Sequence, residues 1–200
     1  IPVYNEEDNI VKLINEIYSL DFAVFDFETI VVDDQSSDNT FSLLKKCQKK
    51  YNNLKVLKHD NNKGQSFALK TGINFALYNN IITMDGDGQN DPKDILKLCS
   101  YYFDERFSYK LIGGLRKNRK DSNLKKYSSL IANKIRKKIL KDKCNDTGCS
   151  LKIFDKKIFL SFPFFNGIHR FLPALFTGYG HETFFLDVNH RSRVHGISKY

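Results

Sequence analysis

The chain has 200 residues, of which 41% are hydrophobic and 28% are charged, a composition typical of a soluble globular protein. This length supports one sizeable core, so we expect a single domain over residues 1–200. The formal net charge of +9 comes from residues 117–143, which contain eleven Lys or Arg and two Asp. The sequence has no secretory signal and no run of about eighteen apolar residues that would span a bilayer.

The chain begins at Ile1–Tyr4, which has the pattern of a strand end and follows no methionine. We therefore expect a fragment whose first strand is truncated, and any membrane segments of a longer protein would lie outside these residues. The four cysteines form no CxxC pair and have no histidine at zinc-finger spacing. They predict a reducing, cytoplasmic environment.

Strands and helices alternate through the first half of the chain. We expect strands near residues 1–4, 28–32, 55–59 and 81–84, separated by helices near 6–20, after Asp38, near 65–77 and near 93–103. Asn5 and Asp91 would cap the first and last of these helices, and Phe103 would face inward. Because the strands are continuous apolar runs, the pattern predicts an α/β fold with a mostly parallel central sheet between two helical layers.

The second half of the chain is less regular. Strands are predicted at residues 111–114, ending at Arg116, and at 150–154. A basic amphipathic helix is predicted over residues 123–141. The phenylalanine-rich segment 159–185 should be broken by Pro163 and Pro173 into short helices or loops, and we expect its rings in the core rather than in a membrane.

Polar clusters follow four of the predicted strands. In parallel sheets, ligands bind at the carboxyl ends of the strands, so these clusters should converge on one edge. No G-x-G-x-x-G follows the first strand and no P-loop motif occurs, which excludes dinucleotide-binding and P-loop enzymes. The clusters are Tyr4–Glu6, Asp33–Asp34, Lys63–Gly64 and Asp85–Asp87.

The Asp85-Gly86-Asp87 cluster suits a divalent metal ion. Two carboxylates with a glycine between them, and the amide oxygen of Gln89 nearby, are hard oxygen ligands of the kind that Mg²⁺ or Mn²⁺ takes. A simple turn after a strand is the competing interpretation. An EF-hand loop is excluded, because its required glycine and glutamate positions hold Asn90 and Leu96.

Together these motifs resemble the inverting glycosyltransferases of family 2, which have the A-type glycosyltransferase fold. The resemblance rests on Pro2–Glu6, on the Asp33–Thr40 segment, on Asn62–Gly64 and on Asp85-x-Asp87-x-Gln89-x-x-Pro92. The second half is similar to the dolichol-phosphate mannosyltransferase branch, which includes bacterial polyprenyl-phosphate sugar transferases. That similarity rests on Gly114-x-Arg116, Ser129-x-x-Ala132-Asn133, Asp146-x-Gly148 and Arg193-x-x-Gly196-x-Ser198-Lys199.

The resemblance implies roles for particular residues. On the donor side, Pro2 and Tyr4 would contact the nucleotide base, Glu6 the ribose, and Val32 and Asp34 the base edge. Lys63, Gly64 and Gly86 would also line the donor site, and Asp85, Asp87 and Gln89 would hold Mg²⁺ or Mn²⁺ on the diphosphate. Arg116, Lys125 and Ser129 would hold an acceptor phosphate, although relatives usually have arginine at the Lys125 position. Arg193, Ser198 and Lys199 would belong to a mobile loop over the donor, and Asp87, Arg116 and Arg193 would serve catalysis.

The implied reaction moves a sugar from a UDP- or GDP-linked donor to a polyprenyl or dolichyl phosphate. A phosphate monoester is already a nucleophile at neutral pH, because its second pKa is near ~6, so no general base is required. His169 is the nearest candidate base, with a structural histidine as the competing interpretation. Arg170 would either hold a phosphate or pair within the fold. Transfer to a glycan hydroxyl in polysaccharide synthesis is the alternative function, but that reaction needs a base.

The predicted basic helix favours docking at an anionic membrane surface on the cytoplasmic face. A solvated helix face is the simpler explanation of the same charge. Nucleic acid is not an expected partner, because the acidic clusters on the sheet edge would repel its phosphates. A catalytically silent protein that binds nucleotide sugars would keep the same motifs, and only an activity assay would distinguish it.

Overall fold

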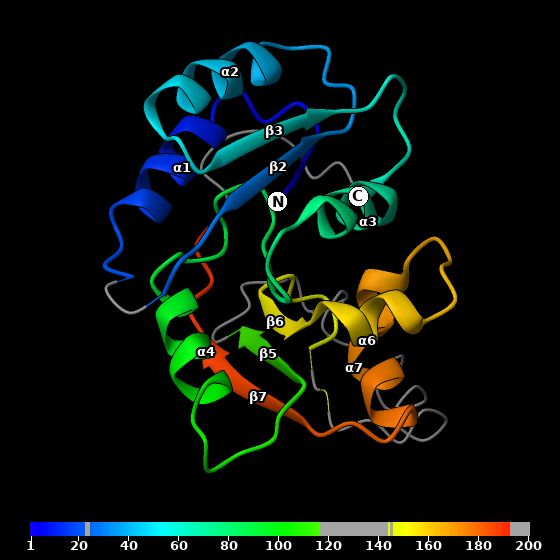
Figure 1. The fold of residues 1–200 in the computed structure, drawn as a ribbon. Coiled ribbons are helices and arrows are strands. Elements are labelled where there is room, and N and C mark those ends of the chain that lie inside the picture. Colours follow the sequence, from blue (N-terminus) through cyan, green and yellow to red (C-terminus); the bar gives the residue numbers. More distant parts are fainter. Residues whose placement is uncertain (23–24, 117–143, 145, 193–200) are drawn as a thin grey trace.

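A computed structural model describes residues 1–22, 25–116, 144 and 146–192 (Figure 1). In its first half, strands and helices alternate as the sequence predicts. The elements are β1 (Pro2–Val3), α1 (Ile10–Tyr18), β2 (Thr29–Asp33), α2 (Thr40–Lys50), β3 (Leu54–Lys58), α3 (Gln65–Phe75), β4 (Asn80–Thr83) and α4 (Asp94–Tyr102). The second half contains β5 (Leu111–Arg116), β6 (Lys152–Asp155), α6 (Lys156–Ser161), α7 (Ile168–Gly178) and β7 (Thr183–Val188).

The strands form two sheets. β1, β2 and β3 pair in parallel, in that order. The second sheet has the order β4-β6-β5-β7, in which β6 is antiparallel to both β4 and β5 while β5 and β7 are parallel. β4, β5 and β7 therefore run in one direction and β6 runs against them. The prediction of a mostly parallel α/β arrangement is confirmed.

Helices cover both sheets (Figure 1). α1 buries one face, made of Ile10, Leu13, Ile14 and Ile17, in the larger hydrophobic cluster. α3 packs on β2, where a side chain at Gly72 would press on Val32 Cγ2 at 3.2 Å. A second cluster joins α6 and α7 to β5 and β6. Among the described residues, none of the helices has the length and apolar character needed to cross a membrane.

Two of the predicted helix starts are wrong. Asn5 does not cap α1, because its φ is +53° and its Oδ1 accepts hydrogen bonds from Ser37 instead. Residues 5–9 form a turn attached to the segment after β2, so α1 begins at Ile10. α4 is capped by Lys93 rather than Asp91, whose carboxylate accepts from the Lys93 N–H at 3.1 Å.

The inward face of α4 also differs from prediction. Leu98 is fully buried, whereas Phe103 is 41% exposed.

The phenylalanine-rich segment differs from prediction at two places. Pro173 does not break the chain but lies buried inside α7, where it gives up one helical hydrogen bond. The strand β7 was not predicted within the phenylalanine-rich segment. It pairs with β5 from Leu111↔Thr183 to Arg116↔Val188.

An apolar cavity of about 350 Å³ separates the two sheets. Its walls come from β2, α3, β4 and α4, and Ile1 also lines it. The Ile1 amino group donates to the Ile30 carbonyl at 2.8 Å, and burial lowers its pKa from 8.0 to about 5, although Asp85 partly opposes this shift. This cavity has the wrong chemistry for a charged nucleotide.

Candidate active site

The Asp85-Gly86-Asp87 turn leaves β4 and lies against the end of β1. A side chain at Gly86 would overlap Val3 Cγ1 and approach the Pro2 carbonyl at 3.3 Å, so glycine is what lets the two segments meet. Because β1 continues directly into Tyr4–Glu6, the first and fourth polar clusters lie together. The predicted convergence of these two clusters is confirmed.

Asp85 is held in place from three directions. Its Oδ1 accepts from Gln65 Nε2 at 2.8 Å, and its N–H donates to Asn90 Oδ1 at 3.3 Å and Ser150 Oγ at 3.2 Å. Burial and then the charge of Asp87 raise the pKa of Asp85 above its ordinary value of 3.8. The hydrogen bond with Ser150 and the charges of Lys152 and Arg116 oppose this rise.

The chemistry of this turn fits a divalent metal ion. Burial and the neighbouring Asp87 make the ionised form of Asp85 costly, and a cation placed beside the two carboxylates would relieve that cost. Within the described ranges, no group of three or more His, Cys, Asp or Glu residues is arranged to hold an ion. The assignment of Asp85, Asp87 and Gln89 as the ligands of such an ion stays a prediction.

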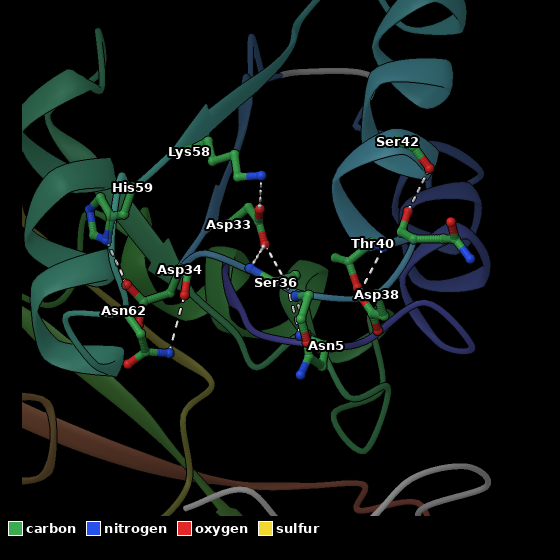
Figure 2. Close-up of polar contacts among 12 residues, drawn as sticks. Asn5, Asp33, Asp34, Ser36, Asp38, Thr40, Ser42, Lys58, His59 and Asn62 are labelled. Atoms are coloured by element: carbon green, nitrogen blue, oxygen red, sulfur yellow. Dashed lines mark hydrogen bonds and ion pairs between the residues drawn. The ribbon is translucent and has the colours of Figure 1, made fainter.

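Asp34 directly follows β2 and organises the Lys63–Gly64 turn. Figure 2 shows its contacts with His59 and with Asn62, which comes just before that turn. Its Oδ1 accepts from the Lys63 N–H at 2.9 Å and from His59 Nδ1 at 2.6 Å, and its Oδ2 accepts from the Gly64 N–H at 2.7 Å. Asp34 is only 1% exposed. Its carboxylate thus fixes the start of α3, and its contact with a nucleotide base stays a prediction.

His59 was not singled out in the sequence. It is buried between Asp34 and Thr71, whose Oγ1 lies 2.9 Å from Nε2. Its position as the last residue of the predicted third strand was the available signal, because the neighbouring strand ends carry polar clusters. The third cluster is thereby joined to the second through Asp34.

The other residues that were predicted to contact the donor lie close to this network. Glu6 is buried, with its Oε2 accepting from Asn9 at 2.8 Å and its N–H donating to Thr40 Oγ1 at 2.8 Å. Pro2 and Val32 are buried, and Tyr4 is half-buried. Their contacts with a nucleotide stay predictions.

Arg116, whose positive charge acts on Asp85, ends β5 and pairs with Asp146. Nε lies 2.7 Å from Oδ2 and Nη2 lies 2.7 Å from Oδ1. A side chain at Gly148 would come within 2.8 Å of Nη2, so the spacing Asp146-x-Gly148 leaves room for the guanidinium. Lys152, which is fully buried nearby, has its pKa lowered by burial.

The segment after β7 runs beside the Asp87–Asp91 turn, and sequence reasoning did not identify it. Arg191 bonds Glu16 at 2.6 Å and Asp91 at 2.9 Å, and its N–H donates to the Gln89 carbonyl at 2.8 Å. His190 forms an isolated bridge with Asn90. The chain is therefore close to the Asp85 turn just before the predicted donor loop.

Five predicted site residues lie outside the described residues, as does the predicted basic helix over residues 123–141. These five residues are Lys125, Ser129, Arg193, Ser198 and Lys199. His169 and Arg170, by contrast, are described. They lie in the first turn of α7, where His169 is half-buried and Arg170 is exposed.

Comparison with curated proteins gives relatives that match the whole chain. A dodecaprenyl-phosphate galacturonate synthase from Rhizobium johnstonii is 37% identical over 205 residues, covering 100% of this chain and 60% of the relative. An undecaprenyl-phosphate 4-deoxy-4-formamido-L-arabinose transferase from Proteus mirabilis is 32% identical over 202 residues, covering 100% and 61%. The chain thus spans about 60% of the length of these relatives.

Solved structures share the fold. Glucosyl-3-phosphoglycerate synthase from Mycobacterium tuberculosis, in complex with Mn²⁺, UDP and glucosyl-3-phosphoglycerate, has a TM-score of 0.72 at 19% identity, covering 96% of this chain and 70% of that one. A mannosyltransferase from Pyrobaculum calidifontis, in complex with GDP-Man and Mn²⁺, has a TM-score of 0.70 at 19% identity, covering 96% and 55%. The predicted A-type glycosyltransferase fold is confirmed.

The family model described as glycosyl transferase family 2 matches residues 1–161, which is most of the chain. The match includes the turns after β1, β2 and β4 and the Arg116–Asp146 pair. The chain therefore belongs to glycosyl transferase family 2.

Proposed function

We propose that this protein transfers a sugar from a UDP- or GDP-linked donor to a polyprenyl phosphate, with inversion at the sugar carbon. The observation that carries the proposal is the Asp85-Gly86-Asp87 turn, which packs against the end of β1 and lies within reach of the positive charge of Arg116. Relatives named for dodecaprenyl and undecaprenyl phosphate match the full chain and support this acceptor class.

On the donor side, Asp85, Asp87 and Gln89 would hold Mg²⁺ or Mn²⁺. When bound, such an ion supplies positive charge that stabilises the departing diphosphate. The turn around Lys63 and Gly64, which Asp34 orients, would border the nucleotide. Structural neighbours crystallised with Mn²⁺ and UDP, or with Mn²⁺ and GDP-Man, are consistent with both parts.

On the acceptor side, Arg116 would hold the phosphate that attacks. A new bond forms between a phosphate oxygen and the sugar C1 as the bond from C1 to the diphosphate oxygen breaks. The nucleoside diphosphate leaves with that electron pair, so no proton has to be removed from a dianionic acceptor. Asp146 keeps the guanidinium oriented for this contact through two hydrogen bonds.

We also propose that the protein associates with the cytoplasmic face of the membrane, where a polyprenyl phosphate presents its head group. The support is the excess of nine positive charges in residues 117–143, since each Lys or Arg near an anionic surface contributes about 1 kcal/mol. Those residues lie outside the described ranges. A liposome cosedimentation assay with anionic and neutral vesicles would test this part, and equal binding to both would contradict it.

The activity is tested by incubating the protein with a panel of UDP- and GDP-sugars, Mn²⁺ and undecaprenyl phosphate in detergent. We expect release of nucleoside diphosphate and formation of a lipid-linked sugar with one donor, and loss of both in chelator. Asp87→Ala should abolish turnover and leave the circular dichroism spectrum unchanged. Efficient transfer to a soluble glycan, with none to the lipid phosphate, would instead establish the hydroxyl-acceptor alternative.

A further inference from the structure

His169 is joined to the start of α3 by one serine. Ser66 Oγ lies 2.8 Å from His169 Nδ1 and accepts a hydrogen bond from the Gly167 N–H, also at 2.8 Å. Ser66 is 0% exposed. This hydroxyl therefore connects the first turn of α3, which begins right after the Asp34-bound turn, to the first turn of α7.

The hydrogen on Ser66 decides which nitrogen of His169 is protonated. If Nδ1 carried the proton and donated to Ser66, the buried hydroxyl hydrogen would have no acceptor among the described residues. Buried hydroxyl groups rarely remain without a partner. The arrangement that satisfies every group has Ser66 donating to Nδ1, and the neutral ring then carries its proton on Nε2.

Burial and the neighbouring positive charges keep the His169 ring neutral. Burial lowers its pKa from 6.5 to about 4, and the neighbouring cations Arg170 and Lys152 add to this shift. Such a ring is a weak base at neutral pH. It is, however, a good neutral hydrogen-bond donor, and Nε2 makes no hydrogen bond with any residue that the structure describes.

We propose that Ser66 fixes His169 as the Nε2–H tautomer, and that His169 donates this hydrogen to a phosphate oxygen of the acceptor. Arg170, adjacent and exposed, adds positive charge at the same end of α7. The assignment makes Ser66 a positioning residue and removes His169 from the role of general base. It rests on the proposed function, because the acceptor phosphate is its ligand.

The tautomer is tested first by ¹⁵N NMR of the full chain at pH 7, with the His169 signals assigned from their loss in His169→Gln. We expect a protonated Nε2 in the natural protein and a mixture of tautomers in Ser66→Ala. Ser100→Ala is the matched control, since Ser100 is an exposed helical serine whose hydroxyl, among the residues that the structure describes, bonds only the Lys97 carbonyl. A protonated Nδ1 in the natural protein would overturn the assignment.

The contact with phosphate is tested with dodecyl phosphate as the probe. We expect the Nε2–H resonance to shift on titration, His169→Ala to weaken probe binding about tenfold, and His169→Gln, which keeps an N–H donor, to retain most of it. An unshifted resonance, or equal losses in both variants, would refute the phosphate contact. If both readouts succeed but no donor supports transfer to undecaprenyl phosphate, only the proposed function fails.

Discussion

Arg116 Nε and Nη2 each lie 2.7 Å from an oxygen of Asp146, which joins the end of β5 to a segment 30 residues further along the chain. The side chains are 14% and 9% exposed, so either partner alone would be a poorly solvated charge. Arg116→Ala should therefore abolish transfer to polyprenyl phosphate, while calorimetry shows unchanged nucleotide binding. It should also lower the free energy of unfolding by about 3 kcal/mol. Loss of nucleotide affinity in this variant would place Arg116 on the donor side instead.

Asp85 is expected to reduce the stability of the metal-free protein. Because its pKa is raised in the folded state, the folded protein holds this proton more tightly than the unfolded chain does. Folding stability should thus rise as pH falls through the raised pKa toward 3.8 and be lowest above it. Asp85→Asn should raise the melting temperature at pH 7.5 without metal and remove any stabilisation by Mn²⁺. A lower melting temperature in metal-free buffer would contradict this account.

His169 should make the protein sensitive to mild acid. The unfolded chain takes up this proton near pH 6.5 and the folded protein only near pH 4. The contribution of His169 to stability is therefore present above pH 6.5 and is lost as pH falls toward 4. Urea unfolding at pH 7.5, 5.5 and 4.5 gives the free energy of unfolding of both proteins. As the pH falls, that of His169→Gln should rise relative to that of the natural protein. Parallel curves for the two proteins would argue against the lowered pKa.

Asp34→Ala should damage both stability and nucleotide binding. The substitution leaves the Lys63 N–H, the Gly64 N–H and His59 without their acceptor, a cost of about 3 kcal/mol in the free energy of unfolding. Loss of the ordered turn should also weaken binding of UDP or GDP by about 1–3 kcal/mol. Asp60→Ala is the control, since Asp60 is exposed in the same loop. Full nucleotide affinity in a folded Asp34→Ala protein would separate this turn from the donor site.

Short-range patterns identified most of the fold. Apolar runs and helical periodicity located β2 and α3 to within a few residues, because those elements bury the faces that the pattern marks. β7 was not predicted because phenylalanine is already frequent in the residues before Thr183–Val188, so the phenylalanines of the strand itself give no contrast that marks it. The start of α1 was missed because side chains after β2 hold residues 5–9 in a turn.

The candidate site was predicted as a set of positions rather than as a network. The Asp85 turn was identifiable, because two carboxylates follow a buried strand. The pairs His59–Asp34 and Arg116–Asp146 were not, since their members lie 25 and 30 residues apart and only the folded sheet brings them together. Ser66 looked like an ordinary first-turn residue until α7 supplied Gly167 and His169 as its partners.

β6 runs against β5, and this brings the two ends of one connection to the same edge of the sheet. β5 leaves the sheet at Arg116, and β6 begins at that edge. The Arg116–Asp146 pair fastens these two ends to each other. A connection whose ends are fixed this close together can change in length at small cost, because loop-closure entropy grows slowly with length. The fold can therefore take connections of different length at this point while the pairing of β5 with β6 is kept.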